Sequence, residues 1–169
     1  DYALFMACKR HFGMKAWTEW PEEALRLRKT PEVLEQYRKQ LQEDVELFVY
    51  IQFLFFQQWT ALRDYLHSLD IQVIGDLPIY VPMDSADVWA EPQFFQLDDQ
   101  CVPTAVSGVP PDYFSEDGQL WGTPLYRWDT MRDDGYGWWI RRIDGAGKLY
   151  DVIRIDHFRG LDTYWAVPY

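Results

Sequence analysis

The chain has 169 residues, of which 48% are hydrophobic and 18% aromatic, and its formal net charge is −11. That length suffices for one ordinary domain with a sizeable core, and no apolar run approaches the roughly 20 residues of a membrane-spanning helix. The acidic balance, with no Lys/Arg stripe, argues against nucleic-acid or membrane partners, because binding to phosphate depends on basic side chains.

The cysteines and the two ends of the chain bear on its location. Cys8 and Cys101 lie far apart without metal-ligand spacing, so we expect no metal site and favour reduced thiols over a disulfide. The start lacks the basic residues and the apolar stretch of a secretory signal, which favours a cytoplasmic protein. Because the chain begins without Met in a helical pattern and ends just past its strongest motif, we expect it to be a segment of a longer polypeptide.

Residues 1–70 are predicted to be mainly helical. Residues 2–12 have the pattern of an amphipathic helix that Gly13 ends, and apolar residues at three- and four-residue steps predict a long helix over about 31–69. The middle of this long helix, "LFVYIQFLFFQQW", is apolar nearly all round. We therefore expect it to be buried on more than one side.

The remaining residues alternate between strand and helix patterns. Residues 71–82 are predicted to contain a strand, 83–130 a long loop on the substrate side, 131–150 a helix, and 151–169 a second strand followed by a loop. This order favours parallel strands joined by crossovers, so the predicted fold class is α/β. In parallel α/β barrels the active site lies at the carboxyl ends of the strands.

Each predicted strand carries an aspartate at or near its end, Asp76 in the first and Asp156 in the second. Residues two apart in a strand face the same way, so Arg154 and Asp156 should point together, and the guanidinium should keep the carboxylate ionised. That suits a nucleophile or an electrostatic stabiliser, although a structural ion pair and a turn carboxylate are the alternatives. His157 should alternate away as a scaffold histidine, unless the strand end twists it back.

The predicted loop carries exposed aromatic candidates, Tyr113, Phe114 and Trp121. The C–H groups on the faces of sugar rings pack on aromatic faces, so such residues beside strand-end carboxylates favour a sugar substrate. The chain has no G-x-S-x-G motif and no glycine-rich phosphate loop. These absences argue against a serine nucleophile and against nucleotide chemistry.

Three motifs, in this order and spacing, resemble the 4-α-glucanotransferases, also called amylomaltases or disproportionating enzymes: "IGDLPIYVPMDSADVWA", "SGVPPDYFSEDGQLWGTPLY" and "VIRIDHFRG". The last is shared in looser form across the α-amylase clan, whereas the middle one is specific to the glucanotransferases. The resemblance covers the whole chain but only the middle of the family's polypeptide. It implies part of a (β/α)8 barrel, incomplete in this chain, since a complete barrel typically needs about 250 residues.

The resemblance also implies roles for single residues. Asp156 matches the family's nucleophile, and Arg154 matches the arginine that orients it and keeps it ionised. Asp76 matches a substrate-contacting aspartate. The other residues expected to bind substrate are Asp112, Tyr113, Phe114, Trp121 and His157. No cofactor is implied, the partners are α-1,4-glucans and maltooligosaccharides, and the acid/base residue belongs to later strands outside this chain.

Two other functions stay open at this point. One is a hydrolase or branching enzyme of the α-amylase clan, and the other is a glucan-binding scaffold that has lost its chemistry. For the leading hypothesis, a retaining transferase, we expect the isolated segment to be inactive, because retaining chemistry uses two carboxyl groups. Its unpaired strand edges are also expected to favour aggregation.

Overall fold

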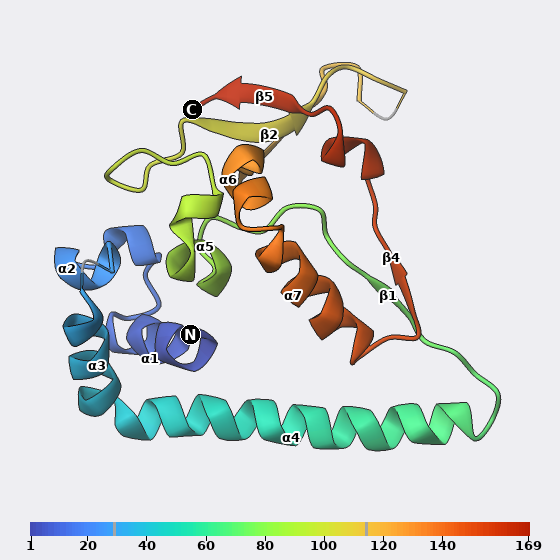
Figure 1. Ribbon diagram of the computed structural model, residues 1–169, viewed down its shortest axis with the longest axis horizontal. Helices are drawn as coiled ribbons and strands as arrows, with labels where there is room; N and C mark the ends of the chain where they lie inside the picture. Colours follow the sequence, from blue (N-terminus) through green and yellow to red (C-terminus); the bar gives the residue numbers. More distant parts are fainter. Residues whose placement is uncertain (29, 114) are drawn as a thin grey trace.

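The computed structural model describes residues 1–28, 30–113 and 115–169. Its helices and strands, in chain order, are α1 (Tyr2–His11), η1 (Trp17–Glu19), α2 (Glu23–Arg26), α3 (Pro31–Gln40), α4 (Gln42–His67), β1 (Ile74–Asp76), α5 (Ala86–Ala90), η2 (Pro92–Phe94), β2 (Ala105–Val109), β3 (Gln119–Pro124), α6 (Trp128–Asp133), α7 (Gly137–Gly147), β4 (Val152–Arg154), η3 (Phe158–Leu161) and β5 (Trp165–Pro168). The long helix α4 lies at one end of the molecule and the sheet containing β2 and β5 at the other, with β1 and β4 side by side between them (Figure 1).

The long helix predicted over 31–69 is two helices in the structure. Thr30 caps the first turn of α3 by accepting a hydrogen bond from the main-chain N–H of Val33, and Pro31 occupies the first helical position, which its fixed φ suits. The chain then leaves helical geometry at Leu41, with φ −108° and ψ 26°. Because the side chain of Leu41 is buried in the core, the apolar pattern runs through the break and does not reveal it.

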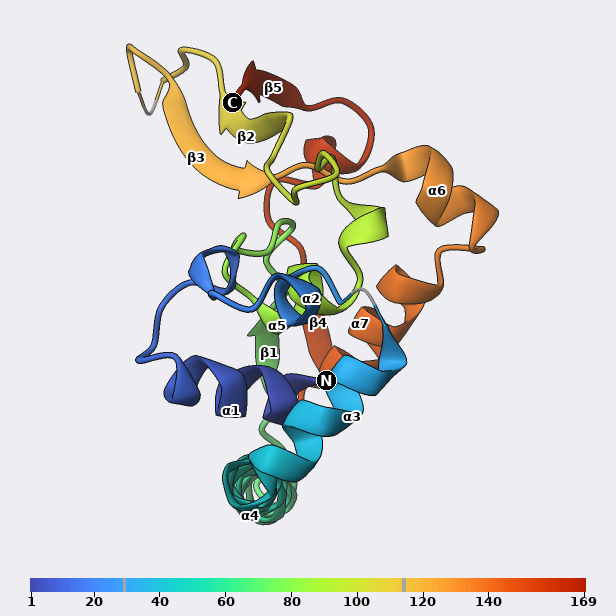
Figure 2. The ribbon, with the colours of Figure 1, turned by 90° about the vertical axis from the view of Figure 1, so that its left-hand side faces the viewer.

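The prediction that the middle of the long helix is buried on more than one side is wrong for this chain. Val45 is its buried residue, while Tyr50, Phe53 and Tyr65 are 56–62% exposed. Figure 2 looks along α4 and shows the rest of the chain on one side of it. Within the described residues, α4 packs mainly on α1 and α3, so these elements cover only part of its apolar surface.

The predicted parallel strand pair is confirmed. β1 and β4 run parallel, with Asp76 opposite Arg154 in the register. Both strands are only three residues long, shorter than the sequence pattern indicates. The fold is therefore α/β in class, as expected.

The segment predicted to be a loop over 83–130 contains regular structure. It includes α5, β2 and β3, and the antiparallel sheet β3–β2–β5 is built mainly from it. Gly122, with φ +74°, lies in β3 where the β2–β3 register shifts, and the hydroxyls of Ser107 and Thr123 are 2.5 Å apart across these strands. The strand signal was hidden because Gly108 interrupts β2, and Gly122 and Pro124 interrupt β3, as a bulged hairpin permits.

Much of the aromatic content fills the core. The largest fully buried side chains include Trp17, Trp20, Trp89, Tyr126 and Phe95. Trp20 and Trp89 meet edge to face with ring centroids 5.6 Å apart, which suits the charge distribution of aromatic rings.

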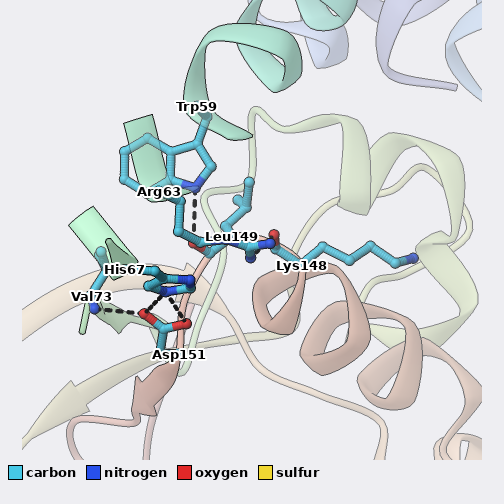
Figure 3. A network of polar contacts seen from close by, with 7 residues as sticks. All are labelled: Trp59, Arg63, His67, Val73, Lys148, Leu149 and Asp151. Carbon is cyan, nitrogen blue, oxygen red and sulfur yellow. Dashed lines mark hydrogen bonds and ion pairs between the residues drawn. The ribbon is translucent and has the colours of Figure 1, made fainter. Parts of the chain in front are cut away.

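Polar contacts from the C-terminal half of α4 hold the start of the parallel strand pair (Figure 3). Trp59 and Arg63 donate hydrogen bonds of 2.8 and 2.6 Å to main-chain carbonyls just after α7. His67 contacts both carboxylate oxygens of Asp151 at 2.9 Å, and Asp151 also accepts a 2.8 Å hydrogen bond from the N–H of Val73. This group of contacts connects α4 to the N-terminal ends of β1 and β4, opposite the strand-end aspartates.

Candidate active site

Arg154 lies between the two strand-end aspartates. Its Nη1 is 3.2 Å from Asp76 Oδ2, and its Nη2 is 2.7 Å from Asp156 Oδ2. The parallel register places Arg154 opposite Asp76, and the two-residue step along the chain places it beside Asp156. The prediction that Arg154 and Asp156 point together is confirmed.

The carboxylate of Asp156 is held in its ionised form. The main-chain N–H of His157 donates a 2.9 Å hydrogen bond to Asp156 Oδ1. That hydrogen bond and then the positive charge of Arg154 hold the pKa of Asp156 below its ordinary value. At neutral pH the side chain therefore presents a negative oxygen, as a nucleophile needs and a general acid does not.

His157 faces the same hollow as Asp156 instead of alternating away from it. Its backbone is left-handed, with φ +51°, and this turn after the end of β4 brings the imidazole back. The imidazole meets the indole of Trp121 edge to face, with ring centroids 4.8 Å apart. Gly160 permits this packing, since a Cβ there would lie 3.0 Å from His157 Cδ2 and 2.8 Å from Ile79 Cδ1.

These side chains border an open hollow, which we call the catalytic pocket. Its volume is about 270 Å³. It is lined by Pro78, Ile79, Tyr80, Trp121, Thr123, Asp156 and His157. The loop that follows β1 and the hairpin strand β3 thus meet the end of β4 here, which brings together residues up to 79 positions apart in the sequence.

Sequence reasoning missed four lining residues, Pro78, Ile79, Tyr80 and Thr123. The position of Tyr80 just after Asp76, in "GDLPIY", was the available signal, because a chain leaving a strand end passes the site built there. The ring of Tyr80 stacks on Tyr126 with centroids 5.7 Å apart, and Tyr126 donates a 2.6 Å hydrogen bond to the carbonyl of Ile79. Burial raises the pKa of Tyr80 to about 12, so its hydroxyl stays neutral.

The remaining predicted site residues have different positions. Asp112 lines a second hollow that adjoins the catalytic pocket at His157. Tyr113 is fully exposed and lines neither hollow. Phe114 lies outside the described residues. Of the three loop aromatics, the structure places Trp121 beside Asp156.

The described residues contain neither a metal-binding cluster nor a membrane-spanning helix. Over residues 1–28, 30–113 and 115–169, no three or more His, Cys, Asp or Glu side chains are placed to hold a metal ion. Both cysteines are buried free thiols. No helix in the same ranges has the length and apolar character needed to cross a membrane.

Comparison with known proteins gives a consistent result. The relatives include proteins named 4-alpha-glucanotransferase from Thermus thermophilus, 51% identical over 99% of this chain, and from Clostridium butyricum, 47% identical over all of it. A rice protein named as a chloroplastic or amyloplastic 4-alpha-glucanotransferase is 51% identical over 99% of the chain. The chain covers 33%, 34% and 28% of these three proteins, so it spans about a third of the length of the relatives it matches.

A solved structure supports the same assignment. The amylomaltase from Streptococcus agalactiae in complex with acarbose superposes with a TM-score of 0.93 at 46% identity, over 99% of this chain and 34% of that one. The family model described as 4-alpha-glucanotransferase matches residues 1–169. On the combined strength of sequence and fold, this chain belongs to the 4-alpha-glucanotransferase family.

Proposed function

We propose that the chain is the nucleophile-bearing part of an enzyme that transfers α-1,4-glucan segments to glucose or maltooligosaccharide acceptors. The observation that carries this proposal is Arg154, which contacts both Asp76 and Asp156 at the edge of an open pocket. Trp121 and His157 give that pocket an aromatic wall suited to the face of a pyranose. The names of the relatives, and the acarbose bound to the neighbouring structure, support a glucan as the substrate.

In the proposed reaction Asp156 is the nucleophile. Its carboxylate attacks the anomeric carbon of a bound glucan, the glycosidic bond breaks, and the departing oxygen takes a proton from an acid/base residue outside these 169 residues. A hydroxyl of the acceptor glucan then attacks the same carbon, loses its proton to that residue and releases Asp156. The two displacements retain the anomeric configuration.

Arg154 has two roles in this mechanism. It favours the ionised form of Asp156 before attack, and its simultaneous contact with Asp76 keeps the guanidinium in place. Asp76, Trp121 and His157 are proposed to contact substrate. The proposed chemistry needs a carboxylate nucleophile and a proton donor, and neither role calls for a metal or an organic cofactor.

We further propose that β1 and β4 are neighbouring strands of a (β/α)8 barrel completed by other parts of the polypeptide. The parallel register and the strand-end aspartates support this arrangement. We also propose a cytoplasmic location for the protein, whereas the relatives from rice and potato are named as chloroplastic or amyloplastic.

Incubation of the full-length protein with maltotriose tests the function. We expect glucose together with chains longer than maltotriose, and we expect Asp156→Asn to abolish both products. Asp99→Asn, at an exposed turn, is the matched control and should leave product formation unchanged. The 169-residue chain alone should form no product.

Other products would identify the alternatives. Release of maltose and glucose without any longer chain would indicate a hydrolase. New α-1,6 linkages would indicate a branching enzyme. Binding of maltooligosaccharides with no reaction would indicate a scaffold without catalytic activity.

A further inference from the structure

One side of the catalytic pocket is formed by the chain that leaves β1, residues 78–80, which we call the pocket wall. All three of its residues line the pocket, and the side chains of Ile79 and Tyr80 are only 6% and 7% exposed. The pocket wall lies outside the described helices and strands. Because a buried carbonyl group without a hydrogen-bond donor is costly, the position of the wall depends on donors from elsewhere in the fold.

Two side chains donate hydrogen bonds to main-chain carbonyl groups of the pocket wall. Tyr126, which follows β3, donates a 2.6 Å hydrogen bond from its hydroxyl to the carbonyl oxygen of Ile79. Arg142, on α7, donates a hydrogen bond from Nη2 to the carbonyl oxygen of Pro78, and its Nη1 is 3.5 Å from that of Ile79. Neither Tyr126 nor Arg142 lines the catalytic pocket. The wall is therefore held from behind.

Aromatic rings fix Arg142 in turn. The central carbon of its guanidinium lies 5.3 Å from the ring centroid of Trp138 and 5.1 Å from that of Trp139, within the range of a cation–π interaction. Both tryptophans are buried. The ring of Tyr126 packs on the same two indoles, with centroids 5.4 and 5.5 Å away. The two donors thus share one aromatic support, which sets their direction toward the pocket wall.

The pocket wall contacts the residues that are proposed to bind substrate. The ring centroids of Tyr80 and Trp121 are 6.2 Å apart, and Trp121 meets His157. A Cβ on Gly160 would lie 3.2 Å from the hydroxyl oxygen of Tyr80, so the wall also packs closely on η3. A shift of the wall would therefore displace Trp121 and His157 relative to Asp156.

We propose that Arg142 is a positioning residue for glucan transfer, which fixes the pocket wall without touching substrate. This inference rests on the proposed function. A wall held in one place orients the reacting glucose against Asp156, and a misplacement of about 1 Å can lower a rate about 100-fold. Arg142 should therefore affect turnover from α7, although the side chains that bind substrate are unchanged.

Steady-state kinetics of the full-length protein on maltotriose test the proposal. Arg142→Met keeps an unbranched side chain against the indoles but removes the hydrogen-bond donors. We expect kcat to fall about tenfold and KM to change less than about twofold, because the side chains proposed to bind substrate remain. Arg142→Lys keeps a donor that can reach one carbonyl group, so it should recover part of the lost kcat.

The neighbouring arginine on the same helix provides the matched control. Arg141 forms an ion pair with Glu91, with Nη2 2.6 Å from Oε1, and it makes no contact with the pocket wall among the hydrogen bonds of the described residues. Arg141→Met should therefore leave kcat and KM unchanged.

Amide hydrogen exchange needs no turnover, so it separates this proposal from the proposed function. Peptides that cover residues 77–82 should exchange faster in full-length Arg142→Met than in the unmodified protein, whereas Arg141→Met should not change their exchange. Tyr126→Phe removes only the hydroxyl and keeps the aromatic packing. It should speed the same exchange and lower kcat about threefold, which provides a second test if Arg142→Met fails to fold.

Two results would overturn the proposal. One is unchanged exchange of the pocket wall in both Arg142→Met and Tyr126→Phe, and the other is an unchanged kcat in both. The proposed function fails separately, if the unmodified full-length protein forms no product from maltotriose.

Discussion

Arg154 is the residue on which the geometry of the candidate active site depends most. One guanidinium contacts carboxylates from two different strands, so it joins the ends of β1 and β4 and also favours the ionised form of Asp156. A structural ion pair and a positioning role for the proposed nucleophile, Asp156, are therefore not exclusive. The positioning role can be distinguished from a purely structural ion pair by the effect of Arg154 on the protonation of Asp156.

Replacement of Arg154 by Met tests this effect in the full-length enzyme. Loss of the positive charge should raise the pKa of Asp156, so the acidic limb of the kcat/KM profile should move to higher pH. The N–H of His157 remains as a donor, so the rise should be partial. We expect kcat at neutral pH to fall about 100-fold, since a misplaced nucleophile reacts poorly.

Arg132→Met is the matched control for this substitution. Arg132 forms an exposed ion pair with Asp129 on α6, and its loss should leave both kcat and the pH profile unchanged. If Arg154→Met lowered kcat without moving the acidic limb, Arg154 would act through position alone. Our interpretation of its electrostatic role would then be wrong.

At the scale of elements, the close contact between β1 and the turn before β4 depends on Gly75. A Cβ at that position would lie 2.0–2.4 Å from three ring atoms of Tyr150, so no side chain fits without displacing the ring. This contact brings the two short strands into register and so sets the separation of Asp76 and Arg154.

Gly75→Ala should therefore destabilise the protein by about 1–3 kcal/mol, the usual cost of overpacking a buried site. Gly147→Ala, at the end of α7, is the control, because nothing lies within 4 Å of a Cβ there. That substitution should be neutral or stabilising by up to ~1 kcal/mol. Thermal unfolding midpoints measure both, and equal midpoints would contradict the packing argument.

The contacts that connect α4 to the parallel strands should be acid-sensitive. The N–H of Val73, followed by His67, holds the pKa of Asp151 below its ordinary value. Folding thus favours ionised Asp151, and this contribution is complete above the unfolded-state pKa of about 3.9 and disappears as pH falls through the lower folded value.

Asp151→Asn should lower the thermal unfolding midpoint of the full-length protein at pH 7. The difference in midpoint between this variant and the unmodified protein, which we call the gap, should become smaller below about pH 4. Asp99→Asn, at an exposed turn, should show no such pH-dependent gap. A gap of constant size from pH 7 to pH 3 would show that the carboxylate charge at position 151 does not matter.

At the scale of the whole molecule, the described part of the chain leaves much apolar surface uncovered. Exposed large side chains occur along α4, as at Tyr50, Phe53 and Phe56, and also at Ile74 in β1 and Val152 in β4. Monomeric proteins rarely expose apolar patches beyond a few hundred square ångströms, and open strand edges promote pairing between chains.

Expressed alone, the 169-residue chain should therefore self-associate. Light scattering during size-exclusion chromatography should show a mass above the 20.2 kDa of one chain, increasing with concentration. Replacing Phe53 and Phe56 by Glu should shift the distribution toward the monomer, because charges on α4 oppose its burial. A monodisperse monomer at all concentrations would contradict this expectation.

The sequence predicted the pairing of Arg154 with Asp156 better than it predicted the elements around them. The two-residue step from Arg154 to Asp156 sets their shared direction through the geometry of an extended chain, and the structure confirms it. The break at Leu41 and the strands β2 and β3 were missed. The break leaves the apolar pattern uninterrupted, and the glycines that allow a bulged hairpin also look like loop residues.

By itself the sequence determined the family motifs, the α/β class and the local pairing of Arg154 with Asp156, because these depend on neighbouring residues. Only the tertiary structure decided that Asp76 shares the same arginine, that His157 turns back toward Trp121, and that Arg142 on α7 holds the pocket wall. Each of these depends on contacts between residues 36 to 78 positions apart or on a left-handed backbone at one residue. Sequence periodicity reports which face a side chain takes within one element, whereas the packing of several elements sets which faces meet.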